Sequence, residues 1–150
     1  MAMAWITRIT NMGSSAVTLL QNDPSWHPVV DGRQYGMDEP IVVAPGASHH
    51  CSYFVIPWRD YGRLEIRTAR GALTYFVAPG DRGLDYLQGR ASTGAQPAAI
   101  DLGRQGNQFY SPSHELRLEL TDSGVSFVKL GIGWESVVGT ALFDLLLGRR

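Results

Sequence analysis

The residues in this sequence best suited to bind a metal or act as a nucleophile are His49, His50 and Cys51. Alternation along a strand places His49 and Cys51 on one face and His50 on the other. Two ligands could hold a soft metal, but structural zinc sites have four protein ligands and catalytic ones usually three. A cysteine nucleophile needs a partner base, which neighbours on an extended strand do not supply. We therefore expect Cys51 to be a small buried residue, and predict no metal, cofactor or catalytic residue here.

Other catalytic patterns are equally incomplete. The sequence has no Gly-x-Ser-x-Gly turn for a serine nucleophile. The glycines at 80, 83 and 89 lack the Lys-Ser or Lys-Thr that completes a phosphate-binding loop. We predict a protein that is not an enzyme; a hydrolase or metalloenzyme using His49 and Cys51 is the third and least supported hypothesis.

Aromatic residues in loops are the better candidates for a binding site. The chain has four Trp, six Tyr and five Phe, and three of these rings fall in predicted loops: Trp26, Trp58 and Tyr61. Trp and Tyr combine an apolar body with a polar edge, which suits membrane interfaces and contacts with sugars or proteins. We predict that these three residues bind a lipid or another ligand.

The elements that would hold these loops are short strands, because β-branched and aromatic runs of strand length are bounded by Gly, Pro or Asn. Between residues 63 and 67 charged and apolar residues alternate, so Leu64 and Ile66 should face a core. We predict a mainly β fold, an antiparallel β-sandwich of about eight strands. The strands are expected at 4–10, 16–20, 41–43, 51–56, 63–68, 73–78, 114–120 and 125–130.

The connections follow from turn residues. We expect hairpins across residues 11–15 and 122–124, and a long loop over 21–40. The glycine-rich segment 80–113 is expected to be the least regular part of the chain.

The C-terminal region has a different period. Trp134, Val137, Val138, Ala141, Leu142, Leu145 and Leu146 follow helical spacing, which predicts one α-helix over 134–147. This helix would cap the sandwich. Alternatively, Val137, Leu142 and Leu145 form a seam for self-association, which makes a protein-interaction or assembly subunit the second functional hypothesis.

Length and charge limit the function further. The 150 residues suit a single domain over 1–150, and a formal charge of −1 argues against nonspecific nucleic-acid binding. The single cysteine excludes an intrachain disulfide. We see no classical signal peptide or transmembrane segment, and expect a soluble protein that is cytoplasmic or exported by a non-classical route.

The first fifty residues resemble the aegerolysin family of small β-sandwich proteins. The resemblance is carried, in order and spacing, by Trp5-Ile6, Ile9, Asn11-Met12-Gly13-Ser14, Val17, Pro24-Ser25-Trp26-His27, Asp31-Gly32, Pro45-Gly46 and the strand at Cys51. It implies binding to membrane lipids, notably sphingolipid headgroups, and in some members recruitment of a larger pore-forming partner. By position it assigns Trp26 to the lipid interface, whereas Trp58 and Tyr61 come from composition alone. Near-zero net charge suits zwitterionic headgroups.

Overall fold

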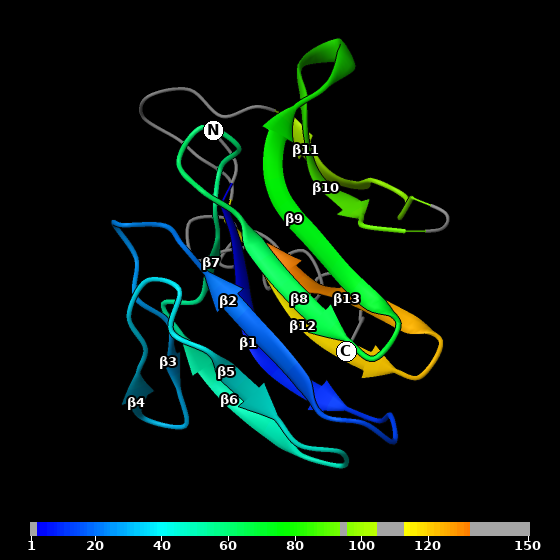
Figure 1. The fold of residues 1–150 in the computed structure, drawn as a ribbon. Helices are drawn as coiled ribbons and strands as arrows, with labels where there is room; N and C mark the ends of the chain where they lie inside the picture. Colours follow the sequence, from blue (N-terminus) through cyan, green and yellow to red (C-terminus); the bar gives the residue numbers. More distant parts are fainter. Residues whose placement is uncertain (1–2, 94–95, 105–112, 133–150) are drawn as a thin grey trace, which may run out of the picture.

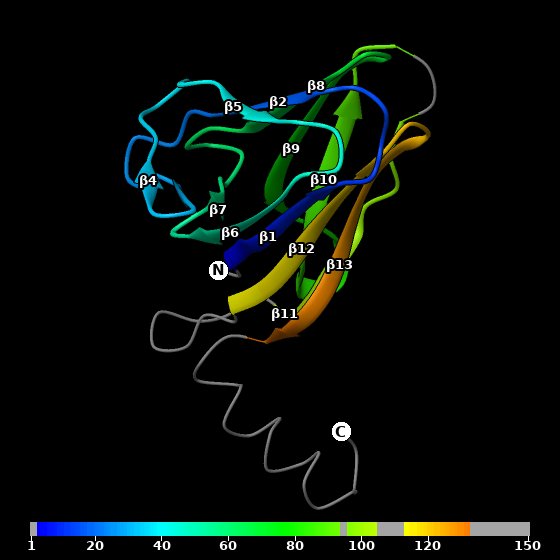
Figure 2. The same ribbon diagram turned by 90° about the horizontal axis from the view of Figure 1, so that it is seen from below.

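Two β-sheets pack face to face in the computed structural model, which describes residues 3–93, 96–104 and 113–132 (Figure 1). The first sheet contains, in spatial order, β13 (Gly124–Ile132), β12 (Ser113–Thr121), β1 (Met3–Asn11), β6 (Ser48–Ser52), β3 (Val29–Val30) and β4 (Arg33–Gln34), with β7 (Val55–Ile56) also paired to β1. The second contains β11 (Ile100–Arg104), β10 (Leu84–Ala91), β9 (Gly71–Pro79), β8 (Leu64–Thr68), β2 (Val17–Gln21) and β5 (Ile41–Val43). Figure 2 shows the two layers, with β1, β6 and β12 in one and β2, β5 and β8 in the other.

The prediction of a mainly β fold is confirmed. Within the described residues the only helical element is a 3-10 turn, η1 (Asp81–Gly83), between β9 and β10. The α-helix predicted over 134–147 lies outside the described residues. Pairing is antiparallel except at the centre of the first sheet, where β1 and β12 run parallel, and at an isolated bridge between Trp58 and Val77.

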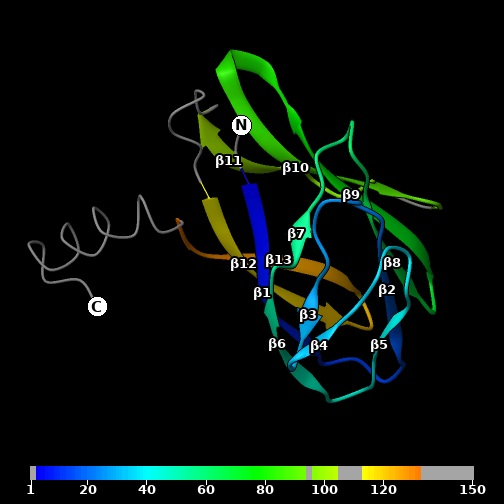
Figure 3. The same cartoon turned by 90° about the vertical axis from the view of Figure 1, so that its left-hand side faces the viewer.

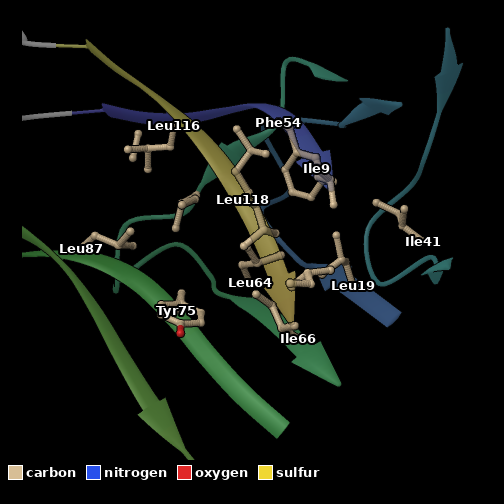
Figure 4. Packing of buried hydrophobic residues seen from close by; sticks show 14 of the residues in the cluster. Ile9, Leu19, Ile41, Phe54, Leu64, Ile66, Tyr75, Leu87, Leu116 and Leu118 are labelled. Atoms are coloured by element: carbon tan, nitrogen blue, oxygen red, sulfur yellow. The ribbon is translucent and has the colours of Figure 1, made fainter. Parts of the chain in front are cut away.

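The core lies between the sheets, and alternation specifies it. Leu64 and Ile66 on β8 are fully buried, as the sequence predicted, and Leu116 and Leu118 on β12 face them across the sandwich (Figure 4). On β1 the buried positions change from even to odd numbers at Thr7, because the register with β12 shifts between Ile6 and Arg8. An extra residue at such a bulge turns every later side chain to the opposite face.

The N-terminal hairpin prediction is wrong. β1 and β2 belong to different sheets, so the connection after Asn11 crosses from one layer to the other. The Asn11 amide, which is 1% exposed, donates hydrogen bonds to the carbonyls of Ser15 and Val43 and holds this crossing. A buried polar side chain, and not a tight turn, sets the geometry here.

The strand predicted over 51–56 is interrupted. Tyr53 has φ +54°, which ends β6 at Ser52 and lets β7 begin at Val55. The Phe54 carbonyl still accepts a hydrogen bond from Ile6 N, at 2.8 Å. Beyond β6, the short strands β3 and β4 extend the edge of the sheet within the predicted long loop (Figure 3).

The described residues form thirteen strands, more than the eight predicted. The additional ones are the two-residue strands β3 and β4, the division of the 51–56 run, and β10 and β11 inside the segment expected to be irregular. Gly89 explains part of the error, because a Cβ at this position of β10 would lie 2.6 Å from the Tyr75 ring. That glycine makes room for an aromatic ring inside a sheet and does not mark a turn.

Candidate functional site

The three aromatic residues predicted to bind a ligand lie in loops at one end of the sandwich. Gln21 at the end of β2 pairs with Leu64 at the start of β8, so loops 22–28 and 57–63 leave these strands at the same end of the sandwich (Figure 1). Asn22 N donates to the Arg63 carbonyl at 3.3 Å, and Arg63 N donates to Asn22 Oδ1 at 2.7 Å. We call these two loops, together with Trp5, the aromatic end.

Trp26 is held by another ring. Its centroid lies 5.1 Å from that of Trp5, with the planes at 79°, and both side chains are half-buried. Edge-to-face packing of this kind fixes a ring while leaving part of it in solvent. Trp26 is therefore anchored as well as accessible.

Trp58 and Tyr61 differ in exposure. Trp58 is half-buried against the core, and its turn is attached to β9 by hydrogen bonds from Val77 N to Pro57 O and from Arg59 N to Val77 O. Tyr61 is 62% exposed at the tip of the same turn, where its amide donates to the Trp58 carbonyl at 2.8 Å. The structure places all three predicted residues at one end, with Tyr61 the most accessible.

Charges at the aromatic end are balanced. Arg59 Nε lies 3.8 Å from Asp60 Oδ1, and both side chains are largely exposed. An exposed pair of this kind adds little stability, since solvent screens it. It leaves the loop tip close to neutral.

The opposite end of the sandwich contains a cavity of about 600 Å³ that the sequence did not predict. It is lined by residues from four places in the chain: 11–17, 68–75, 91–93 together with Pro97, and 121–125. Asp122 accepts hydrogen bonds from Ser14 N at 2.8 Å and from Ser14 Oγ at 2.9 and 3.1 Å. The backbone and then the hydroxyl of Ser14 hold the pKa of the Asp122 carboxyl below its usual 3.8. We call the cavity and its turns the hydroxyl end.

Asp31 is the hydrogen-bond partner of the His49–Cys51 stretch. His49 Nδ1 lies 2.5 Å from Asp31 Oδ2, and Asp31 Oδ1 accepts from His50 N. These two hydrogen bonds, His49 first, lower the pKa of Asp31. Cys51 is half-buried and not fully buried as expected. This partial burial, aided by the charge of Asp31, raises the pKa of its thiol to about 12, so the thiol stays protonated near neutral pH. A protonated thiol is a poor nucleophile and a poor metal ligand.

Within the part of the chain that the structure describes, no three side chains of His, Cys, Asp or Glu gather closely enough to hold a metal ion. No helix within those ranges has the length and apolar character needed to cross a bilayer.

Comparison of the chain with protein-family models, with curated proteins and with solved structures gave no match.

Proposed function

We propose that this chain is a non-enzymatic protein that binds membrane lipids through its aromatic end. The observation that carries the proposal is the position of Trp26 and Tyr61, on two loops tied together at Asn22 and Arg63, with ring surface left in solvent. Trp and Tyr are enriched at membrane interfaces because their rings enter the acyl boundary while the polar edge stays hydrated.

Anchoring favours this use of Trp26. A side chain that is free before binding loses rotamer freedom on contact, at a cost of about 0.5–1.5 kcal/mol. The Trp26 ring is already packed against Trp5, so less of that freedom is left to lose. The site is thus partly preorganised.

The lipid class follows from charge and from the resemblance of the first fifty residues to aegerolysins. The chain carries a formal charge of −1, and Arg59 and Asp60 balance each other at the loop tip. Such a surface has no strong attraction for anionic lipid, so a zwitterionic headgroup of the sphingolipid type is the proposed ligand. Recruitment of a larger pore-forming protein, which the resemblance also implies, belongs to the same proposal.

Co-sedimentation with vesicles tests the proposal. The wild-type chain should pellet with sphingomyelin–cholesterol vesicles. Trp26→Ala should lower the affinity roughly tenfold, because about 1.4 kcal/mol of ring insertion is lost. Val42→Ala is the matched control, since Val42 is an apolar side chain 60% exposed on β5, outside the aromatic end. No pelleting with a panel of zwitterionic and anionic vesicles, or equal loss in the control, would contradict lipid binding at this end.

The second candidate function is self-association through the predicted helix over 134–147. The helical spacing of Val137, Leu142 and Leu145 favours it. Sedimentation velocity over a range of concentrations should then show a dimer that Leu142→Asp converts to a monomer. A monomer at every concentration would refute this alternative.

A further inference from the structure

The cavity at the hydroxyl end is independent of the proposed lipid site. Four turns from both sheets surround it, at the end of the sandwich where β8 finishes and β9 begins. The loops of Trp26 and Tyr61 lie at the opposite end (Figure 1). The cavity's volume of about 600 Å³ lies within the range of small-molecule sites, roughly 300–1,000 Å³.

Hydroxyl groups dominate the polar lining of this cavity. They come from Ser15, Ser92, Thr93, Thr121 and Ser123, among others. Several are held in place: Ser92 Oγ accepts from Ala72 N at 3.1 Å, and Thr121 Oγ1 lies 3.0 Å from Ser123 Oγ. A hydroxyl both donates and accepts hydrogen bonds, so this lining matches a ligand that does the same.

Arg70 and Asp122 are the charged residues of the lining. Their opposite charges leave the cavity with no net charge. Asp122 repels a small anionic ligand and Arg70 repels a small cationic one, so neither kind of ligand is favoured. Ser14 supplies the hydrogen bonds that Asp122 accepts from described residues, and a carboxylate has about four acceptor positions. Asp122 therefore keeps acceptor capacity for donors on a ligand.

Tyr75 provides a polar group among apolar lining residues such as Val17 and Leu73. Its ring is fixed edge-to-face against Phe127, with centroids 4.8 Å apart, and Gly89 leaves the space that the ring occupies. None of the described residues forms a hydrogen bond with the Tyr75 hydroxyl. Burial raises the pKa of this phenol to about 12, so the hydroxyl stays a donor at neutral pH.

We propose that this cavity binds a neutral saccharide of one or two rings. A sugar ring has an apolar C–H face that suits Val17 and Leu73, and hydroxyls that pair with the serines, threonines and Tyr75. Adjacent sugar hydroxyls can donate to the two oxygens of Asp122 and accept from Arg70, and such charge-assisted hydrogen bonds are the stronger kind. The size, the hydroxyl lining and the cancelled charge all point to the same class of ligand.

The test is NMR titration of the full chain with glucose, galactose, mannose, N-acetylglucosamine and lactose. At least one sugar should shift the amide signals of residues 12–15 and 121–124, with a Kd on the order of 1 mM. Tyr75→Phe, which removes only the hydroxyl, and Asp122→Asn should each weaken binding roughly tenfold, the loss of one good hydrogen bond to the ligand. Tyr86→Phe is the control, because Tyr86 lies on β10 outside the cavity lining.

Three results would overturn the saccharide assignment. One is the absence of shifts with every sugar; another is unchanged affinity in both Tyr75→Phe and Asp122→Asn. The third is binding of phosphocholine that depends on Asp122, or of inorganic phosphate that depends on Arg70, in place of sugars, which would make the site one for charged ligands. Vesicle sedimentation of the same variants separates the saccharide proposal from the lipid proposal, since Asp122→Asn should leave binding to vesicles unchanged.

Discussion

The two ends of this sandwich are closed in different ways. At the aromatic end large rings pack on one another and on the core, as Trp26 does on Trp5 and Trp58 does beside Val77. At the hydroxyl end the turns carry Ser, Thr, Gly and Ala, and a cavity of about 600 Å³ is left between them. One scaffold thus offers a ring-covered surface at one end and a hollow at the other, because side-chain volume in the turns differs.

An asparagine organises each end, and substituting each shows how differently the ends are held. Asn11 is 1% exposed, accepts from Gly13 N and donates to the carbonyls of Ser15 and Val43. Asn11→Ala leaves both carbonyls without this donor, and an unsatisfied buried polar group costs about 1–3 kcal/mol. We expect a loss of about 3 kcal/mol in the free energy of unfolding, measured by urea denaturation.

The matched change at the aromatic end is Asn22→Ala. Asn22 is half-buried, and its Oδ1 accepts from Arg63 N, which water can solvate when the side chain is gone. We expect a loss of about 1 kcal/mol. Equal losses in the two variants would mean that the Asn11 crossing is not a special support of the hydroxyl end.

Sequence alternation predicted the core because period-two burial depends only on local side-chain direction. Leu64 and Ile66 are therefore buried where expected. The failures concern pairing: the hairpin expected after Asn11 is a crossing between sheets, and the 51–56 strand is broken at Tyr53. Those features depend on partners far along the chain, which a local pattern does not contain.

The candidate sites divide in the same way. Trp26 and Tyr61 could be selected because aromatic residues between Gly and Pro indicate a loop. The cavity could not, since Ser14, Arg70, Ser92 and Asp122 come from four separate turns. In the sequence, Asp122 is one residue of an ordinary Asp-Ser-Gly turn, and only pairing of β12 with β1 brings it beside Ser14.

The pH dependence of stability should also distinguish two regions, one around the buried His114 and the other around Asp122 at the hydroxyl end. His114, near the start of β12, is 6% exposed, and among the described residues its Nε2 has no hydrogen-bond partner. Burial, aided by the charge of Lys129, lowers its pKa below 6.5, against a hydrogen bond to Leu102 and the charges of Asp101 and Asp85. The unfolded chain therefore binds the proton more readily, and the stability due to neutral His114 is lost as pH falls below about 6.5.

We expect Tm to fall by a few degrees as pH falls below 6.5, and His114→Leu to flatten this dependence. Asp122 at the hydroxyl end affects stability in a lower range of pH. Because its pKa is lowered from 3.8, the stability it contributes is present above 3.8 and is lost only as pH falls below that value. Thermal melts of wild type, His114→Leu and Asp122→Asn measure both pH ranges. An unchanged slope in His114→Leu would show that another group controls acid unfolding.

The smallest effect on stability is expected from Tyr61→Ala, and it separates binding from folding at the aromatic end. Tyr61 is 62% exposed, and the hydrogen bond of its amide to the Trp58 carbonyl is made by the backbone, which alanine retains. Changes at such surface positions usually stay within about 0.5 kcal/mol. Trp26→Ala also removes the contact with Trp5, an aromatic pair worth about 0.5–1.5 kcal/mol beyond its buried area. If the aromatic end binds lipid, both variants lose vesicle binding although only Trp26→Ala is measurably less stable. If instead vesicle binding falls only in the less stable variant, the rings of this end serve to close the sandwich, and Tyr61 has no part in recognition.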